Sequence, residues 1–181
     1  MSPLSRRNKY RFLALSLALA LGSLLLIPLL ITAASPAPLV GWPVRGRISQ
    51  PFGCSPYYSG IPGPACPAEA PWFHDGLDIA VPSGQPVRAA ISGTVIFAGA
   101  DGTGPACGRY RGYGLAVVID SGSGWQTLYG HLSDIFVVKG QPVRPDSLIG
   151  LSGASGCVSG PHLHFGLRGP AGVVDPAVHL E

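Results

Sequence analysis

The stretch Leu115–Tyr129 reads Leu-Ala-Val-Val-Ile-Asp-Ser-Gly-Ser-Gly-Trp-Gln-Thr-Leu-Tyr. Two runs rich in Val, Ile, Thr and aromatic residues, Leu115–Asp120 and Trp125–Tyr129, flank Gly122-Ser123-Gly124. Residues of these types favour β-strands, and a glycine-rich interruption between two such runs is typical of a hairpin connection. We therefore expect two strands joined by a short turn.

The rest of the body continues this pattern of short apolar runs separated by glycines. Ile91–Ala98 and Ile135–Val138 are two further predicted strands. From Gly41 to the end, the longest stretch without glycine or proline is His131–Lys139, nine residues, whereas a packed helix usually needs about 10–12. The chain is 46% hydrophobic and 12% charged, which argues against a disordered chain. The body is predicted to be all-β and not a helical bundle.

The N-terminus has the features of an export segment. Four cations lie within the first eleven residues, and the 23 residues Phe12–Ala34 that follow carry no charge. A helix of that length spans a bilayer core of about 30 Å, and the preceding cations would keep its start in the cytoplasm. We expect residues 1–34 to form a signal anchor or signal peptide, with the uncleaved anchor favoured. Small residues at Thr32-Ala33-Ala34 leave cleavage open.

Beyond this segment, residues 35–43 are rich in proline and are predicted to be a linker, and residues 44–181 to be the folded domain. The net charge of +3 comes from the N-terminus, because residues 41–181 hold eight cations and nine acids. A nucleic-acid partner is not expected, since binding to nucleic acid needs a basic patch on the folded part.

The four cysteines all follow the apolar segment, which places them in an oxidising compartment if the chain is exported. Of the three possible connectivities we favour Cys54–Cys66 and Cys107–Cys157, because the first pair brackets one loop rich in proline and glycine. Free buried thiols remain an alternative. A zinc site made of four cysteines is less favoured, because no Cys-x-x-Cys pair is present.

Histidines stand in three unusual contexts. In His74-Asp75-Gly76-Leu77-Asp78, an even offset on an extended strand places His74 and Asp78 on one face, although a structural hydrogen bond is the commoner role of such a pair. In Gly160-Pro161-His162-Leu163-His164-Phe165, the two imidazoles point the same way on a strand while the apolar residues face the core. His131 follows Tyr129-Gly130 at a predicted strand end.

Together, these segments resemble the M23 zinc metallopeptidases, the LytM or lysostaphin-type peptidoglycan endopeptidases. The resemblance runs from about Arg47 to Leu180 and rests on His-x-Gly-x-Asp, then Gly-His-Leu-Ser, then Gly-Pro-His-Leu-His-Phe. It implies a compact antiparallel β-sheet or barrel-like sandwich domain with an active-site groove. It also implies a zinc-dependent endopeptidase that hydrolyses amide bonds in the peptide part of bacterial peptidoglycan, outside the cytoplasm.

The resemblance assigns a role to each motif residue. His74, Asp78 and His164 match the zinc ligands of the family, and His131 and His162 match its two catalytic histidines. Three protein ligands leave one tetrahedral position open, as catalytic zinc requires. One catalytic histidine would accept a proton from water, and the other would stabilise the oxyanion or protonate the leaving amine. Which histidine does which stays open at the sequence level.

Several features depart from the family pattern. The insertion Cys54–Trp72 is long and is a candidate wall of the substrate groove. Within it, Tyr57 and Tyr58 are candidates for a tyrosine that helps to hold the transition state, although loop packing is the more favoured role. Gly166 stands where the family commonly has an acidic residue, which we expect to change the groove edge more than the zinc site. His179 lies outside the motifs and is expected to be structural or exposed.

Two other function classes remain as alternatives. The chain could be an exported wall-binding or regulatory module that activates another wall hydrolase, but such members typically lack zinc-site residues and all five expected positions are kept here. A biotinyl or lipoyl carrier is suggested by the repeat of Gly84–Arg88 as Gly140–Arg144, yet Lys139 is not in a carrier motif. The repeat itself predicts two similar halves of one sheet assembly, unless it is coincidental.

Overall fold

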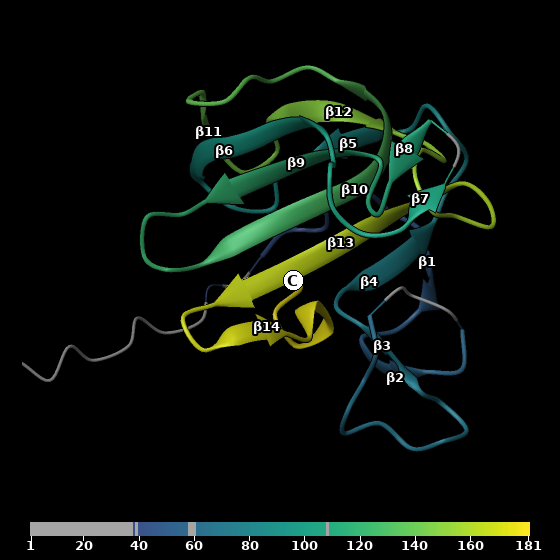
Figure 1. Cartoon of the computed structure of the whole chain (residues 1–181). Helices are drawn as coiled ribbons and strands as arrows, with labels where there is room; N and C mark the ends of the chain where they lie inside the picture. Colours follow the sequence, from purple (N-terminus) through teal and green to yellow (C-terminus); the bar gives the residue numbers. More distant parts are fainter. Residues whose placement is uncertain (1–37, 39, 58–60, 108) are drawn as a thin grey trace, which may run out of the picture. The chain divides into compact units, whose positions relative to one another are not determined.

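The computed structural model describes residues 38, 40–57, 61–107 and 109–181 (Figure 1). The predicted N-terminal helix and residues 35–37 and 39 of the predicted linker lie outside these residues. Within the described part, no helix is long and apolar enough to cross a membrane. The elements, in chain order, are β1 (Arg47–Gln50), β2 (Gly53–Ser55), β3 (Trp72–His74), β4 (Leu77–Ala80), β5 (Pro86–Arg88), β6 (Gly93–Ala100), β7 (Ala106–Cys107), β8 (Tyr110–Arg111), β9 (Leu115–Asp120), β10 (Gln126–Ile135), β11 (Pro142–Val143), β12 (Leu148–Ser152), β13 (His162–Gly169), β14 (Gly172–Val174) and the 3₁₀ turn η2 (Pro176–Val178).

One large antiparallel sheet organises the domain. Its main path is β1-β4-β13-β10-β9-β6-β11, and β12 pairs with both β10 and β5 while β14 pairs with β13. Figure 1 shows β4, β13, β10, β9 and β6 running side by side. Two small sheets, β2-β3 and β7-β8, accompany it. The expectation of an all-β antiparallel domain is confirmed.

The hairpin predicted within Leu115–Tyr129 joins β9 to β10. Asp120 pairs with Gln126, and the Ser121 N–H donates to the Trp125 carbonyl across the turn (2.9 Å). Both turn glycines have positive φ, 80° at Gly122 and 84° at Gly124. A residue with a side chain adopts that conformation only at a cost, so glycine is required there.

The expectation of a separate strand over Ile135–Val138 is wrong. The second hairpin strand continues through His131 and ends at Ile135, so β10 takes in ten residues. His131 has a φ of 61°, and at this point β10 changes partner, from β13 up to Gly130 to β12 from Leu132 onward. A bend with a change of partner is a tertiary feature that strand propensity does not reveal.

The core lies on one face of the central strands. In β4, Leu77 and Ile79 are fully buried while Asp78 alternates with them on the other face. Leu163 and Phe165 of β13 are likewise fully buried, as the alternation of their strand predicted. The same layer contains other fully buried side chains, among them Tyr129, Ile119, Leu132, Ile149 and Leu167. The opposite face of β4 and β13 is thereby left for the polar residues of the motifs.

The repeated pentapeptide marks an internal symmetry. The first copy, Gly84–Arg88, contains β5, and the second copy, Gly140–Arg144, contains β11. β5 pairs with β12, the strand that follows the second copy. In the same way, β11 pairs with β6, the strand that follows the first copy. The main-chain bonds repeat as well: Gly84 N–H donates to Ser152 O, and Gly140 N–H donates to Val95 O. The two copies are therefore equivalent parts of two similar halves, and each half supplies the pairing partner of the other.

Both predicted disulfides are present. Cys54–Cys66 closes the loop between β2 and β3, and Cys107–Cys157 joins β7 to the segment between β12 and β13. None of the cysteines is free. The alternatives of free thiols and of a four-cysteine metal site are excluded in this structure.

Candidate metal centre and catalytic histidines

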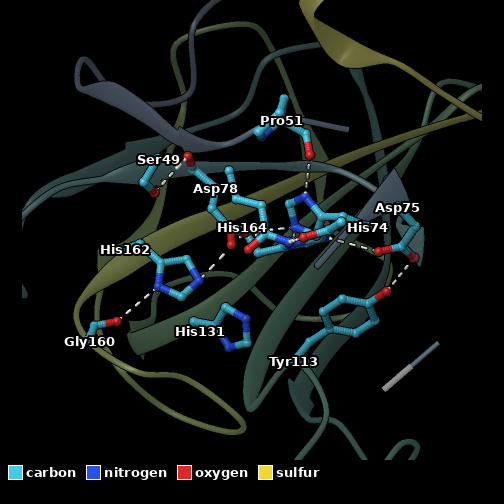
Figure 2. A network of polar contacts seen from close by, with 12 residues as sticks. Ser49, Pro51, His74, Asp75, Asp78, Tyr113, His131, Gly160, His162 and His164 are labelled. Carbon is cyan, nitrogen blue, oxygen red and sulfur yellow. Dashed lines mark hydrogen bonds and ion pairs between the residues drawn. The ribbon is translucent and has the colours of Figure 1, made fainter. Parts of the chain in front are cut away.

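Three strands bring His74, Asp78 and His164 together on the polar face (Figure 2). His164 of β13 is the direct cross-strand partner of Asp78 of β4, so both side chains project on the same side of the sheet. His74 ends β3 just before the turn into β4. The two histidines are 5% and 3% exposed, so the cluster is enclosed on most sides.

The donor atoms of this cluster have the spacing of a metal site. His74 Nε2 lies 3.1 Å from Asp78 Oδ1 and 3.2 Å from His164 Nδ1, and the latter two atoms are 3.0 Å apart. Ligands about 2.0–2.1 Å from a tetrahedral zinc ion lie roughly 3.3 Å from one another. Two imidazoles and one carboxylate are also suitable donors for zinc. The three residues thus fit the ion that the sequence resemblance implies.

Gly76 explains the glycine of the His-x-Gly-x-Asp motif. A Cβ atom at this position would lie 2.6 Å from the Phe165 carbonyl oxygen and 2.7 Å from His164 Nε2. Atoms of that kind do not approach so closely without a shift of backbone or ring. Glycine at 76 therefore lets the β3–β4 turn pass against the His164 imidazole.

His131 and His162 stand beside the three-residue cluster, with their rings 4.7 Å apart. The Nδ1 of His131 lies 2.8 Å from Ser155 O, and the Nδ1 of His162 lies 2.9 Å from Gly160 O. A carbonyl only accepts hydrogen bonds, so each Nδ1 carries a proton and donates it. In a neutral ring, Nε2 then keeps its lone pair and is free to act as an acceptor or base.

In this cluster, burial and charge pairing shift the pKa values of Asp78 and His164 in opposite directions. Burial alone would raise the pKa of Asp78, but hydrogen bonds from His164 and His74 hold it well below its usual range. Burial would lower the pKa of His164, yet the carboxylates of Asp75 and Asp78 raise it to about 9 in the absence of metal. For His131, burial and the neighbouring imidazoles lower the pKa to about 3, so this ring is neutral near pH 7.

Asp75 and Tyr113 also belong to the site, although the sequence motifs did not single them out. The Tyr113 hydroxyl donates to Asp75 Oδ2 (2.5 Å), and Asp75 Oδ1 lies 3.4 Å from His164 Nε2. Both residues and His164 line a cavity of about 250 Å³ that extends along β10 and β13 to Arg168. By contrast, Tyr57 is 68% exposed, and Tyr58 lies outside the described residues.

His179 and the insertion Cys54–Trp72 lie outside the three-residue cluster. His179 caps the 3₁₀ turn and is half-buried, with its ring 5.8 Å from that of Trp125, in agreement with a structural role. The insertion leads into His74 through the β2-β3 pair, in which Gly53 faces His74. Its role as a groove wall stays a prediction.

Comparison with known proteins gives consistent matches. The sequence model of Peptidase family M23 matches residues 72–176, which contain all five motif residues. The DD-carboxypeptidase/endopeptidase Mpg of Neisseria meningitidis serogroup B is 39% identical over 126 residues, which are 69% of this chain and 25% of that protein. The chain therefore corresponds to a part of this longer relative.

Two solved structures share the fold. A zinc-containing peptidase from Vibrio cholerae is 31% identical with a TM-score of 0.59, over 75% of this chain and 38% of that one. The catalytic domain of the antimicrobial peptidase lysostaphin from Staphylococcus simulans is 26% identical with a TM-score of 0.58, over 74% of this chain and 90% of that one.

Proposed function

The chain belongs to peptidase family M23, and from this premise we propose that it is a zinc-dependent endopeptidase that hydrolyses amide bonds in the peptide part of bacterial peptidoglycan. The main support is the triangle of donor atoms from His74, Asp78 and His164, whose edges measure 3.0–3.2 Å. Two further histidines adjoin this triangle. The names of the relatives, a DD-carboxypeptidase/endopeptidase and a zinc-containing peptidase, agree with this chemistry.

In this proposal, zinc is held by His74 Nε2, Asp78 Oδ1 and His164 Nδ1. When bound there, zinc supplies Lewis-acid chemistry: it polarises the scissile carbonyl and makes water acidic enough to attack near neutral pH. The ligand histidine His74 is oriented by its Nδ1–H, which donates to Pro51 O (2.8 Å). That hydrogen bond fixes the tautomer and leaves Nε2 available as a ligand.

The two remaining histidines supply the proton transfers. We assign His131 as the proton acceptor, because its Nδ1–H donates to Ser155 O and so leaves the lone pair on Nε2. We assign the second role to His162, whose Nε2 lies 3.5 Å from Asp78 Oδ1 and so faces the proposed metal ligands. In this role a proton on Nε2 stabilises the oxyanion of the substrate and is donated to the leaving amine.

The proposed site of action is the cell envelope, with the chain either anchored through residues 1–34 or secreted. The two disulfides support this, because such bonds form and persist in oxidising compartments. Peptidoglycan is then the substrate within reach, and the proposed membrane contact is made through the N-terminal segment. The proposal also includes a regulatory protein partner in the envelope. No contact among the described residues identifies that partner.

Digestion of purified peptidoglycan tests the function. The full-length protein is loaded with zinc and incubated with walls of several cross-link types, and the products are read by mass spectrometry. New peptide fragments that vanish with a chelator are the expected result, and they name the bond. If the folded, zinc-loaded protein releases nothing from any wall type, the regulatory alternative takes the place of the peptidase.

Single substitutions test the roles of the two histidines. His131→Ala and His162→Ala are each expected to lower cleavage by about 10²–10⁴-fold, the usual contribution of a general acid or base. Zinc affinity should stay close to that of the parent protein, because neither residue supplies one of the three donor atoms. His164→Ala, the matched ligand variant, should lose both activity and zinc. Full activity in His162→Ala would contradict the proposed mechanism.

A further inference from the structure

His164 is oriented differently from the other three histidines of the site. Its Nδ1 faces Asp78 Oδ1 and His74 Nε2, whereas His74, His131 and His162 all turn Nδ1 toward a backbone carbonyl. If Nδ1 of His164 binds a metal, it must be unprotonated, so the ring proton has to sit on Nε2. The opposite edge of the ring then needs a hydrogen-bond acceptor.

The His164 Nε2 atom is buried and has no hydrogen-bond partner within bonding geometry. A buried N–H without an acceptor costs about 1–3 kcal/mol. The acceptor facing it is Asp75 Oδ1 at 3.4 Å, beyond the usual 2.7–3.2 Å range for an N–H···O bond. A displacement of a few tenths of an ångström by either side chain would complete the bond.

Asp75 is itself held in place. Its second carboxylate oxygen accepts the hydrogen bond of the Tyr113 hydroxyl, and the Tyr113 ring packs 4.9 Å from the His164 ring. The side chain of Asp75 is 21% exposed and that of His164 is 4% exposed, so water reaches the carboxylate only partly. The row of contacting side chains Tyr113, Asp75 and His164 therefore reaches the candidate metal centre from the side opposite Asp78 (Figure 2).

We propose that Asp75 is a positioning residue that accepts the Nε2 proton of His164 and so sets the orientation and donor strength of this ligand, with Tyr113 fixing the carboxylate. This rests on the proposed function, because it requires that the cluster binds zinc. Carboxylate–histidine–zinc arrangements raise the basicity of the ligand, and loss of such an outer partner typically costs 10–100-fold in metal affinity.

The structure offers an independent route for a carboxylate to reach the same atom. Gly166 lies two residues after His164 on β13, and a Cβ atom built there would be 3.9 Å from His164 Nε2, with no neighbour closer than 3.5 Å. Its φ is not in the left-handed region, so a side chain is tolerated. An aspartate at 166 can therefore present an oxygen to Nε2 when Asp75 is removed.

Zinc affinity, measured by competition with a chromophoric chelator, tests the proposal on the full-length protein. Asp75→Asn keeps an acceptor oxygen but loses the charge, and Asp75→Ala loses both. We expect about 10–100-fold weaker zinc binding for Asp75→Ala and a smaller loss for Asp75→Asn. Tyr113→Phe keeps the carboxylate charge and should give a smaller loss than Asp75→Ala. The double variant Asp75→Asn/Gly166→Asp should recover part of the affinity.

Two measurements separate positioning from a loss of structure. The visible absorption of Co²⁺ bound in place of zinc reports the ligand field, and it should change in Asp75→Ala but not in Asp134→Asn, a control that removes a charge from an exposed position in β10. Circular dichroism checks that each variant is folded. If Asp75→Ala fails to fold, Tyr113→Phe and the double variant still decide the question.

Each outcome has a defined meaning. Weaker zinc binding, an altered Co²⁺ spectrum and rescue by Gly166→Asp support the proposal. If the parent protein binds zinc and all Asp75 and Tyr113 variants bind it equally well with the same Co²⁺ spectrum, Asp75 has no positioning role while the peptidase proposal survives. If the parent protein itself binds no zinc, the proposed function is overturned, and this inference with it.

Discussion

Gly76 lies where the turn between β3 and β4 passes directly against His164, one of the three residues of the candidate metal centre. The β3–β4 turn must pass close enough to His164 for His74 and Asp78 to reach its Nδ1 atom. The 2.6 and 2.7 Å distances from a Cβ at this position to Phe165 O and His164 Nε2 leave no space for a methyl group. The motif therefore contains glycine for a steric reason that acts directly on a proposed ligand.

Gly76→Ala is expected to weaken zinc binding, because the added methyl group displaces the His164 ring or the turn. We expect a loss of at least tenfold in zinc affinity, similar to the loss of an outer-shell partner. Chelator competition measures it. Gly102→Ala is the matched control, since a Cβ there meets nothing within 4 Å. Equal zinc affinity in the two variants would show that the ring has room after all.

Tyr129 carries a second steric and polar constraint, in the core and away from the site. The fully buried Tyr129 hydroxyl oxygen accepts the Ala90 N–H (2.7 Å), and burial raises the pKa of Tyr129 to about 12. Tyr129→Phe leaves the buried Ala90 N–H without an acceptor. We expect a free energy of unfolding about 1–3 kcal/mol lower at pH 7, measured by urea denaturation.

The pH dependence of this difference has a definite sign. A folded pKa above the unfolded value near 10 stabilises the protein fully below pH 10, and this contribution is lost as the pH rises toward 12. The stability gap between the parent protein and Tyr129→Phe should therefore narrow between pH 10 and 12. Tyr57→Phe, at an exposed tyrosine, is the control and should leave the free energy of unfolding at pH 7 unchanged. A gap for Tyr129→Phe that stays constant up to pH 12 would show that folding does not raise the pKa of this buried hydroxyl.

At the scale of elements, the strands with regular local patterns were predictable. Leu115–Asp120 is found as predicted, and the predicted Ile91–Ala98 is displaced by two residues into β6, Gly93–Ala100. The extension of the second hairpin strand to Ile135 in β10 was not predictable, because it depends on the bend at His131. That bend is fixed by partners far along the chain: Tyr113 O accepts the His131 N–H, and Ser155 O accepts its ring N–H.

The same distinction holds for the site. The alternation of β13 predicted correctly that Leu163 and Phe165 face the core. The motifs also contain the three residues whose donor atoms come together in the candidate metal centre. The contribution of Tyr113 was not predicted, because the expected tyrosine was placed in the insertion with Tyr57 and Tyr58, whereas Tyr113 reaches Asp75 from 38 residues farther along the chain. The glycine at 166 was expected to alter the groove edge more than the zinc site; it lines the cavity beside Asp75 and His164, and a Cβ there would lie 3.9 Å from His164 Nε2.

The two disulfides join different elements, and we expect them to contribute differently to stability and to cleavage. Cys107–Cys157 closes a loop of 50 residues and Cys54–Cys66 one of 12, for which chain entropy gives about 4 and about 3 kcal/mol. Cys157 also adjoins the segment that holds His131, since Cys157 N–H donates to Gly112 O and Ser155 O accepts from His131. Replacing Cys107 and Cys157 by serine should lower the free energy of unfolding, measured by denaturant unfolding, more than replacing Cys54 and Cys66. It should also reduce cleavage of peptidoglycan.

The 54–66 serine pair serves as the control for that experiment. Its loop is closed by the β2-β3 pairing as well, so its loss should affect stability less and the position of His131 not at all. A larger loss of stability for the 54–66 pair than for the 107–157 pair would contradict this ranking.

At the scale of the described domain, the two halves related by the pentapeptide repeat hold each other through reciprocal strand pairing. β5 needs β12 and β11 needs β6, so neither half completes its hydrogen bonds alone. The proposed metal ligands lie on β3, β4 and β13, on the face opposite the core side chains Leu77, Ile79 and Phe165. Core and metal cluster are thus carried by the same strands but on different faces.

This separation predicts how the whole domain responds to removal of the metal. At a free zinc concentration 100 times the dissociation constant, binding adds about 2.7 kcal/mol to stability, so a chelator should lower the thermal midpoint by on the order of 10 °C. The fold itself should persist at 25 °C, because the apolar layer of β4, β13, β10 and β9 needs no ligand. Far-ultraviolet circular dichroism with and without chelator measures both effects, and His74→Ala, which lacks one proposed ligand, should show a much smaller shift of the midpoint. Unfolding at 25 °C on chelation would mean that the metal cluster, and not the sheet core, supplies the stability of this domain.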